Sequence, residues 1–157
     1  MRVINLDEAK KLSAELKSAG RTISATNGCF DVLHLGHLKY LEKSKELADV
    51  LIVGVNADQS VKQLKGDSRP IHSEQDRAEL LAGLKPVDYV VIFPELDACN
   101  FLEAVKPDFY TKGGDYTPEA LENWPEYSTA SKLGCKIVLV DFIEGKSSTK
   151  ILEKLDQ

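Results

Sequence analysis

The sequence lacks both of the glycine-rich motifs that most often mark a nucleotide site. It contains neither the GxxxxGK[ST] pattern of P-loop proteins nor the GxGxxG turn of dinucleotide-binding folds. A P-loop kinase, a GTPase or a hydride-transferring enzyme would therefore lack its usual phosphate-binding loop in this chain. Nucleotide chemistry in this chain has to rest on a different motif.

Cysteine is scarce as well. The three cysteines, Cys29, Cys99 and Cys135, are widely spaced and form no CxxC pair, which argues against a disulfide framework. We expect reduced, mostly buried thiols. A catalytic role for Cys29 would need a base such as His34, and that histidine is better suited to a phosphate.

Long apolar runs and an excess of positive charge are also missing. No apolar run approaches a membrane span, and the N-terminal stretch MRVINLDEAKKLSAELKSAG is too charged for a signal peptide. The net charge of −5 argues against broad binding to nucleic acid or membrane surfaces. A length of 157 residues, with 43% apolar and 29% charged residues, is typical of a single soluble domain. We expect one domain over residues 1–157, in the cytoplasm.

Histidine is rare, and two of the three histidines lie in the segment TNGCFDVLHLGH, residues 26–37. The segment is predicted to hold a strand end, a tight turn and a helix start, with His34 and His37 on one face of the helix. Gly36 leaves room for a ligand to approach the backbone. Because a helix N-terminus has unpaired N–H groups and a positive dipole end, this arrangement suits the phosphates of a nucleotide.

A zinc site built on the same two histidines is the weaker interpretation. Zinc would need at least one more good ligand, and only His72 and scattered thiols or carboxylates remain. We therefore predict no metal held by the protein's own side chains.

The remainder of the chain alternates short apolar strands with helices. We expect strands at 22–26, 50–55, 87–93, 108–112 and 136–142, and helices at 6–18, 35–47, 58–64, 74–84, 97–105 and 118–133, with a last helix from 148. This order predicts an α/β fold, a Rossmann-like doubly wound parallel sheet of about five strands. Ligands of such sheets bind beyond the carboxyl ends of the strands.

Seven stretches, in order along the chain, resemble the HxGH nucleotidyltransferases, also known as the cytidylyltransferase-like family. Within that family the chain is most similar to the adenylyltransferase domain that makes ADP-heptose. The matching stretches are TNGCFDVLHLGH (26–37), LIVGVNAD (51–58), LKGDSRPI (64–71), EQDRAELLAGL (74–84), VDYVV (87–91), KPDFYTKGGDY (106–116) and EGKSSTKIL (144–152).

The resemblance implies a reaction in which D-glycero-D-manno-heptose 1-phosphate attacks the α-phosphorus of ATP and pyrophosphate leaves. A phosphate monoester is already an anionic nucleophile, so catalysis would rest on positioning and charge stabilisation rather than on a general base. Mg²⁺ would arrive with the nucleotide. The expected partners are ATP and the sugar 1-phosphate, a second copy in a homodimer, and a separate sugar kinase that supplies the acceptor.

The resemblance also assigns roles to residues. The expected catalytic residues are His34, His37 and Lys65. The expected nucleotide-binding residues are Thr26, Asn27, Gly28, Phe30, Arg77, Lys112, Gly113, Ser148 and Thr149. The expected substrate-binding residues are Asp31, Asn56, Arg69, Gly114 and Asp115.

Several of these residues have a plainer alternative. Lys65 could be a solvated lysine of the loop 64–72, which we expect to close over the triphosphate, and Arg69 could pin that loop. Arg77 is predicted at the exposed start of a helix, where a surface salt bridge is the alternative. Asp31 could stabilise its own turn through backbone N–H groups.

Two other functions remain open. Glycerol-phosphate cytidylyltransferases, which would use CTP and glycerol 3-phosphate, carry an arginine in the stretch RTEGISTT. The corresponding stretch here, DFIEGKSST, has none, which favours ATP. Residues 120–134 also depart from the heptose branch, and we expect them to border the sugar. The last alternative is a non-catalytic nucleotide-binding module, against which the intact histidines and lysines argue.

Overall fold

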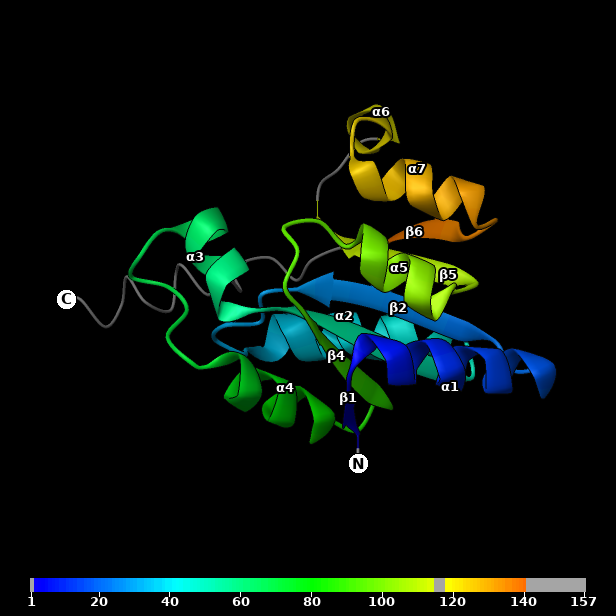
Figure 1. The fold of residues 1–157 in the computed structure, drawn as a ribbon, viewed down its shortest axis with the longest axis horizontal. Coiled ribbons are helices and arrows are strands. Elements are labelled where there is room, and N and C mark those ends of the chain that lie inside the picture. The colour runs from blue at the N-terminus through cyan, green and yellow to red at the C-terminus, as the bar shows by residue number, and fades with distance from the viewer. Residues whose placement is uncertain (1, 115–117, 141–157) are drawn as a thin grey trace.

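The computed structural model describes residues 2–114 and 118–140, and its strands form one parallel sheet (Figure 1). The order across the sheet is β1-β4-β3-β2-β5-β6, and every pairing is parallel. The strands are β1 (Val3–Ile4), β2 (Ile23–Gly28), β3 (Val50–Asn56), β4 (Tyr89–Phe93), β5 (Phe109–Gly113) and β6 (Lys136–Val140).

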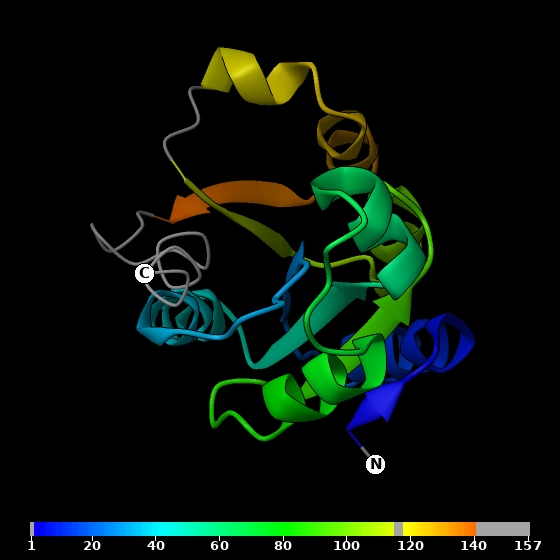
Figure 2. The same ribbon diagram turned by 90° about the vertical axis from the view of Figure 1, so that its left-hand side faces the viewer.

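Helices cover both faces of the sheet (Figure 2). They are α1 (Leu6–Ser18), α2 (Leu35–Glu46), α3 (Asp58–Lys65), α4 (Glu74–Ala82), α5 (Cys99–Val105), α6 (Pro118–Glu122) and α7 (Pro125–Lys132). Helices α1, α5 and α7 pack together on one face, and α2 and α4 pack on the other. The predicted doubly wound α/β fold is confirmed.

Two apolar cores result from the alternation of side chains along the strands. In β3, Ile52 belongs to the core under α1 and α5, whereas Leu51 and Val53 belong to the core under α2 and α4. All seven residues of β3 are buried, as expected for a central parallel strand covered on both faces. This rigid centre fixes the strand ends at which a ligand would bind.

Three details differ from the sequence prediction. The sheet has six described strands rather than about five, because the two-residue strand β1 pairs with β4 at the edge and is too short to give a periodic signal. The single helix predicted over 118–133 is two helices, since Pro125 begins α7 and cannot continue a preceding helix. The helix predicted from 148 lies outside the described residues.

The strand order reverses between β2 and β5. From β2 the chain proceeds to β3 and β4 on one side, and β5 and β6 lie on the other. In open parallel sheets such a reversal leaves a crevice at the carboxyl ends of the two strands. That position coincides with the start of the TNGCFDVLHLGH segment, where β2 ends at Gly28, and with Lys112–Gly113, where β5 ends.

Candidate active site

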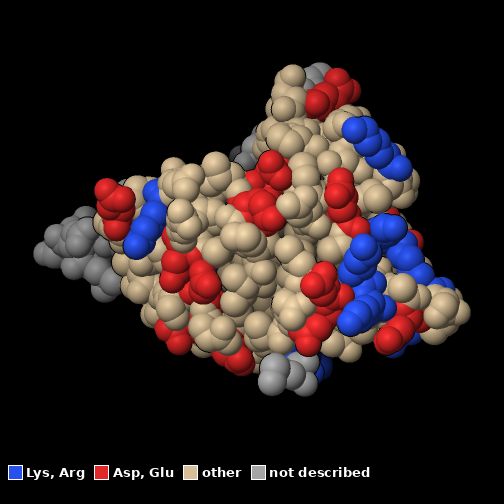
Figure 3. Space-filling view, in the orientation of Figure 1, with Lys and Arg blue, Asp and Glu red and all other residues tan. Residues whose placement is uncertain are grey.

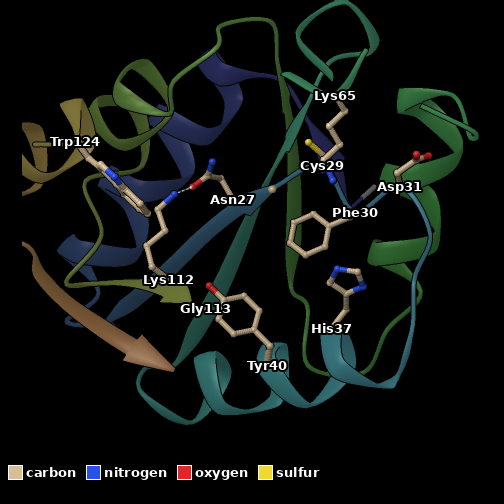
Figure 4. Close-up of a pocket in the computed structure, with 11 residues that line it drawn as sticks. Asn27, Cys29, Phe30, Asp31, His37, Tyr40, Lys65, Lys112, Gly113 and Trp124 are labelled. Atoms are coloured by element: carbon tan, nitrogen blue, oxygen red, sulfur yellow. Dashed lines mark hydrogen bonds between the residues drawn. The ribbon is translucent and has the colours of Figure 1, made fainter. Parts of the chain in front are cut away.

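A cavity of about 230 Å³ opens at this reversal (Figure 4). Its described lining comes from the turn after β2, the start of α2, the last residue of α3, the end of β5 and the residue before α7. The lining residues are Asn27, Gly28, Cys29, Phe30, Asp31, His37, Tyr40, Lys65, Lys112, Gly113 and Trp124.

The two histidines of the motif form the N-terminal cap of α2. Nδ1 of His34 accepts the backbone N–H of Gly36 at 3.1 Å, and Nδ1 of His37 accepts the backbone N–H of His34 at 3.4 Å. The two rings are stacked, with their centroids 3.9 Å apart. Because each Nδ1 is an acceptor, a neutral ring carries its proton on Nε2 and can donate from that atom.

His37 lines the cavity and is held neutral. Burial, reinforced by the nearby positive charges of His34 and Lys65, lowers the pKa of His37 to about 4. A neutral imidazole that donates from Nε2 is suited to binding a phosphate oxygen, and it does not need to be protonated first. His34 packs against the far side of the His37 ring and is not among the residues that line the cavity.

The turn between β2 and α2 places an aromatic residue in an unusual backbone conformation. Phe30 has φ of +48°, in the left-handed region that non-glycine residues seldom adopt. Its ring contacts the His37 ring edge-on at 5.4 Å and covers Gly28, where a Cβ would lie 3.1 Å from the Phe30 ring. A side chain at position 28 would therefore press on the Phe30 ring, so the packing of this turn favours glycine.

Arg77 corrects a prediction. It is fully buried rather than exposed at the start of α4. Its guanidinium donates to the carbonyl of Cys29 at 2.6 Å, to the carbonyl of His72 at 3.1 Å, and to Oδ1 of Asp58 at 2.7 Å. It is not among the residues that line the cavity. The contact with Cys29 places Arg77 as a positioning residue for the strained turn, and the salt bridge that it forms is internal.

Asp31 binds the segment after α3, residues 66–72, to the TNGCFDVLHLGH motif. Its carboxylate accepts the side chain of Arg69 and the backbone N–H groups of Ile71 (2.7 Å) and His72 (3.1 Å). Burial raises the pKa of Asp31, but these hydrogen bonds outweigh that effect, so the pKa lies below its usual value. Asp31 thus holds the segment 66–72 rather than its own turn. Arg69 pins that segment, which was the alternative considered for it.

Lys65 and Cys29 lie together at one end of the cavity. Lys65 is the last residue of α3, not part of a free loop as predicted, and its side chain reaches the cavity (Figure 4). Burial raises the pKa of Cys29, although Lys65 and Arg77 partly oppose the effect. A thiol with a raised pKa is a poor nucleophile at neutral pH, which disfavours the catalytic role considered for it.

Lys112 lies at the opposite end. Its Nζ donates to Oδ1 of Asn27 at 2.9 Å and lies 5.0 Å from the ring centre of Tyr110. Burial lowers the pKa of Lys112, and the carboxylate of Glu126 acts against that shift. Asn27 also accepts the hydroxyl of Tyr110. The amide oxygen of Asn27 therefore orients the lysine at this end of the crevice.

Other predicted site residues lie elsewhere. Thr26 is buried within β2, where its hydroxyl bonds with Tyr40 and with the carbonyl of Thr111. Asn56 is buried and donates to the carbonyl of Glu95 at 3.4 Å. Neither is among the residues that line the cavity, nor is Gly114. Asp115, Ser148 and Thr149 lie outside the described residues.

Sequence reasoning did not select Tyr40 and Trp124. The helical pattern predicted over residues 35–47 gave no sign that the side chain of Tyr40 reaches the cavity. Trp124 lies 97 positions after Asn27, and only the fold brings the two into one cavity. Its place within the divergent segment 120–134 was the one available signal.

Beyond this cavity, the described residues show neither a metal-binding cluster nor a membrane span. Acidic and basic side chains are interspersed over the face seen in Figure 3. Among the described residues, no three histidine, cysteine or acidic side chains gather as a metal site would require, and no helix is both long and apolar enough to cross a bilayer.

Comparison with known proteins decides the family. The sequence pattern that defines the cytidylyltransferase-like family matches residues 25–154. The chain belongs to the cytidylyltransferase-like family. It is a nucleotidyltransferase, and the predicted resemblance is confirmed.

Curated relatives include the bifunctional protein HldE of a Nitratiruptor species, which is 51% identical over 96% of this chain, and that of Campylobacter fetus, 43% identical over 98%. In both cases the chain spans 31% of the relative's length. This member of the family therefore corresponds to about a third of those proteins.

Solved structures show the same fold. A lipopolysaccharide core biosynthesis protein from Thermoplasma volcanium is 32% identical, with a TM-score of 0.61 over 81% of this chain and all of the other. A pantoate-beta-alanine ligase from Francisella tularensis has a TM-score of 0.66 over the whole chain and 80% of its own, at 17% identity, which supports the fold alone.

Proposed function

We propose that this nucleotidyltransferase transfers an adenylyl group from ATP to D-glycero-D-manno-heptose 1-phosphate. A phosphate oxygen of the sugar forms a bond to the α-phosphorus, the bond from that phosphorus to the β-bridging oxygen breaks, and pyrophosphate leaves. The observation that carries the proposal is that His37, Lys65 and Lys112 line one crevice at the carboxyl ends of β2 and β5, with His34 stacked on His37 at the cap of α2.

The groups at the α2 end suit the triphosphate. His37 can donate from Nε2, and Lys65 adds a positive charge beside it. Arg69 is held next to the cavity by its ion pair with Asp31, which lines it. Nη2 of Arg69 is buried and has no hydrogen-bond partner among the described residues. Because an unsatisfied buried donor is costly, a phosphate oxygen is a natural partner for it. Donors placed where charge grows would lower the barrier to loss of pyrophosphate.

Mg²⁺ would enter with the triphosphate and screen repulsion between its oxygens. Asp31 is the one carboxylate among the described lining residues, and its oxygens already bind Arg69 and the backbone of Ile71 and His72. This fits a metal carried by the nucleotide better than one held by the chain. The protein's own contribution is then orientation and charge complementarity.

Heptose as the acceptor, and ATP as the donor, rest on the stretches that resemble the ADP-heptose branch and on the relatives named HldE. The absence of an arginine in DFIEGKSST also favours ATP over CTP. A kinase that phosphorylates the anomeric hydroxyl would have to supply the acceptor, and we further propose that the enzyme acts as a homodimer.

The decisive experiment measures pyrophosphate release with ATP or CTP and a panel of acceptors that includes both anomers of the heptose 1-phosphate and glycerol 3-phosphate. We expect ATP to be preferred at least about tenfold in kcat/KM, equivalent to about 1.4 kcal/mol. A preference for CTP with glycerol 3-phosphate would make the chain a glycerol-phosphate cytidylyltransferase. Nucleotide binding with no release from any acceptor would identify a non-catalytic module.

A further inference from the structure

The one tryptophan of the chain stands at the end of the cavity farthest from Lys65 (Figure 4). Trp124 precedes α7, and its ring lies 5.2 Å from Nζ of Lys112. The same ammonium lies 5.0 Å from the ring of Tyr110. The crevice therefore ends in a cation set between two aromatic rings, which no role described above explains.

The position of the indole is set by the fold. Pro125 begins α7 directly after it, and Oε1 of Glu126 accepts the backbone N–H of Ala98 at 3.2 Å. That bond joins the first turn of α7 to the residue that precedes α5. Glu126 is itself buried, so the segment carrying the tryptophan is anchored to the sheet's helical layer rather than resting on the surface.

Among the described side chains, those of residues 2–114 and 120–140, no carboxylate lies within salt-bridge distance of the Lys112 ammonium. Its polar contact there is the neutral amide oxygen of Asn27. Removing a cation from water is costly unless an opposite charge compensates for it. A lysine placed in this way is suited to an anionic ligand.

The geometry of the reaction says which anion belongs at this end. In phosphoryl transfer the attacking and leaving oxygens lie roughly in line on opposite sides of the phosphorus. The leaving pyrophosphate belongs with His37, Lys65 and the N-terminus of α2. The attacking phosphate should then approach from the side of Lys112.

We infer that Lys112 and Trp124 form the acceptor subsite, in which Lys112 binds the phosphate of a sugar phosphate and the indole of Trp124 packs against the C–H face of the sugar ring. This inference rests on the proposed function. A nucleobase could also stack on the indole, but it is neutral and would give the ammonium no ion-pair partner.

Because the chain has one tryptophan, its fluorescence reports on this subsite directly. The wild-type protein is saturated with Mg²⁺ and α,β-methylene-ATP, which cannot release pyrophosphate, and D-glycero-D-manno-heptose 1-phosphate is then added as either anomer. We expect the main change in emission on addition of the sugar phosphate. A full change with the nucleotide analogue alone, and none with the sugar phosphate, would overturn the inference and make Trp124 a base platform.

Kinetics separate binding from structure. We expect Trp124→Ala to raise KM for the sugar phosphate about tenfold or more while KM for ATP stays within about twofold. Trp124→Phe, which keeps a ring, should recover part of the loss. The matched control is Lys132→Ala, an exposed position in the last turn of the same helix, which should alter neither constant.

The possible failures are distinguishable. An equal rise in both KM values would show that Trp124 acts only through the fold, and the inference would be wrong while the proposed function stood. An increase confined to KM for ATP would show that the indole contacts the nucleotide, and the inference would be wrong. If the wild-type enzyme releases no pyrophosphate with any sugar phosphate, the proposed function itself fails and this inference falls with it.

Discussion

The end of the cavity at His37 and the end at Trp124 are built in different ways. The first comes mainly from one continuous stretch, residues 27–37, in which backbone N–H groups fix both imidazoles. The second combines Asn27 of β2, Lys112 of β5 and Trp124 before α7. The comparison teaches that the chemistry lies in a local motif, whereas the choice of acceptor depends on distant segments brought together by the fold.

The largest effects should come from the histidine end. We expect His37→Ala to lower kcat about 10²–10³-fold, the scale of losing one donor in the transition state. We expect His34→Ala to lower kcat by a similar factor, because its ring stacks on His37 and its side chain caps α2. Steady-state pyrophosphate release is the measurement. The matched control, His72→Ala, removes an exposed histidine side chain outside the cavity and should leave kcat within about twofold. Near-wild-type turnover in His37→Ala or His34→Ala would contradict the assignment of the chemistry to the histidine end.

Next in size is the loss of Arg77. Arg77→Lys cannot reach all of its partners at Cys29, His72 and Asp58, so buried acceptors lose their donors. We expect the free energy of unfolding, measured by urea denaturation, to fall by about 3 kcal/mol. Arg21→Lys, at an exposed position, should change it by less than about 0.5 kcal/mol.

If Arg77 instead bound nucleotide directly, the lysine variant would keep its stability and lose affinity for ATP. Unchanged urea unfolding together with a raised KM would therefore contradict the positioning role.

Two glycines give a smaller and more selective test. An added methyl at Gly28 would lie 3.1 Å from the Phe30 ring, whereas one at Gly54 would lie 3.0 Å from the Phe93 ring in the core. Both alanine variants should lose about 1–3 kcal/mol of stability through overpacking. Only Gly28→Ala should also lower kcat of the folded enzyme, because it displaces the ring that packs on His37. Equal kcat values in the two folded variants would argue against that contact.

The smallest effect concerns protonation. The pKa of His37 is about 4 in the folded chain, below the ordinary value of 6.5, so the folded state binds fewer protons between those values. The stabilising contribution is complete above pH 6.5 and is lost as the pH falls towards 4. We expect NMR titration of the imidazole to show this pKa rising when Mg²⁺ and ATP bind, because an anion favours the charged ring. A pKa near 6.5 without nucleotide would contradict the buried, neutral histidine.

The sequence was sufficient to predict the parallel α/β sheet and the histidine end, because both depend on local periodicity and on residues close in the chain. It misplaced Arg77, since the helix start EQDR is polar and the three partners of its guanidinium lie on other segments. It placed Lys65 in a loop because Gly66 and Pro70 dominate the pattern that follows, although α3 extends through Lys65. Trp124 could not be predicted, because its contact with Lys112 exists only after β5 and α7 are assembled.

Helices α6 and α7 form the connection between two neighbouring strands, β5 and β6, and Trp124 lies between the two helices. Neither helix contributes to the turn that holds the imidazoles. An engineer who keeps the buried Leu121, Glu126 and Ala130 could therefore change the other residues of the segment 120–132, and alter which sugar is accepted, while leaving the phosphate chemistry in place. The fold separates the two tasks into one fixed part and one interchangeable part.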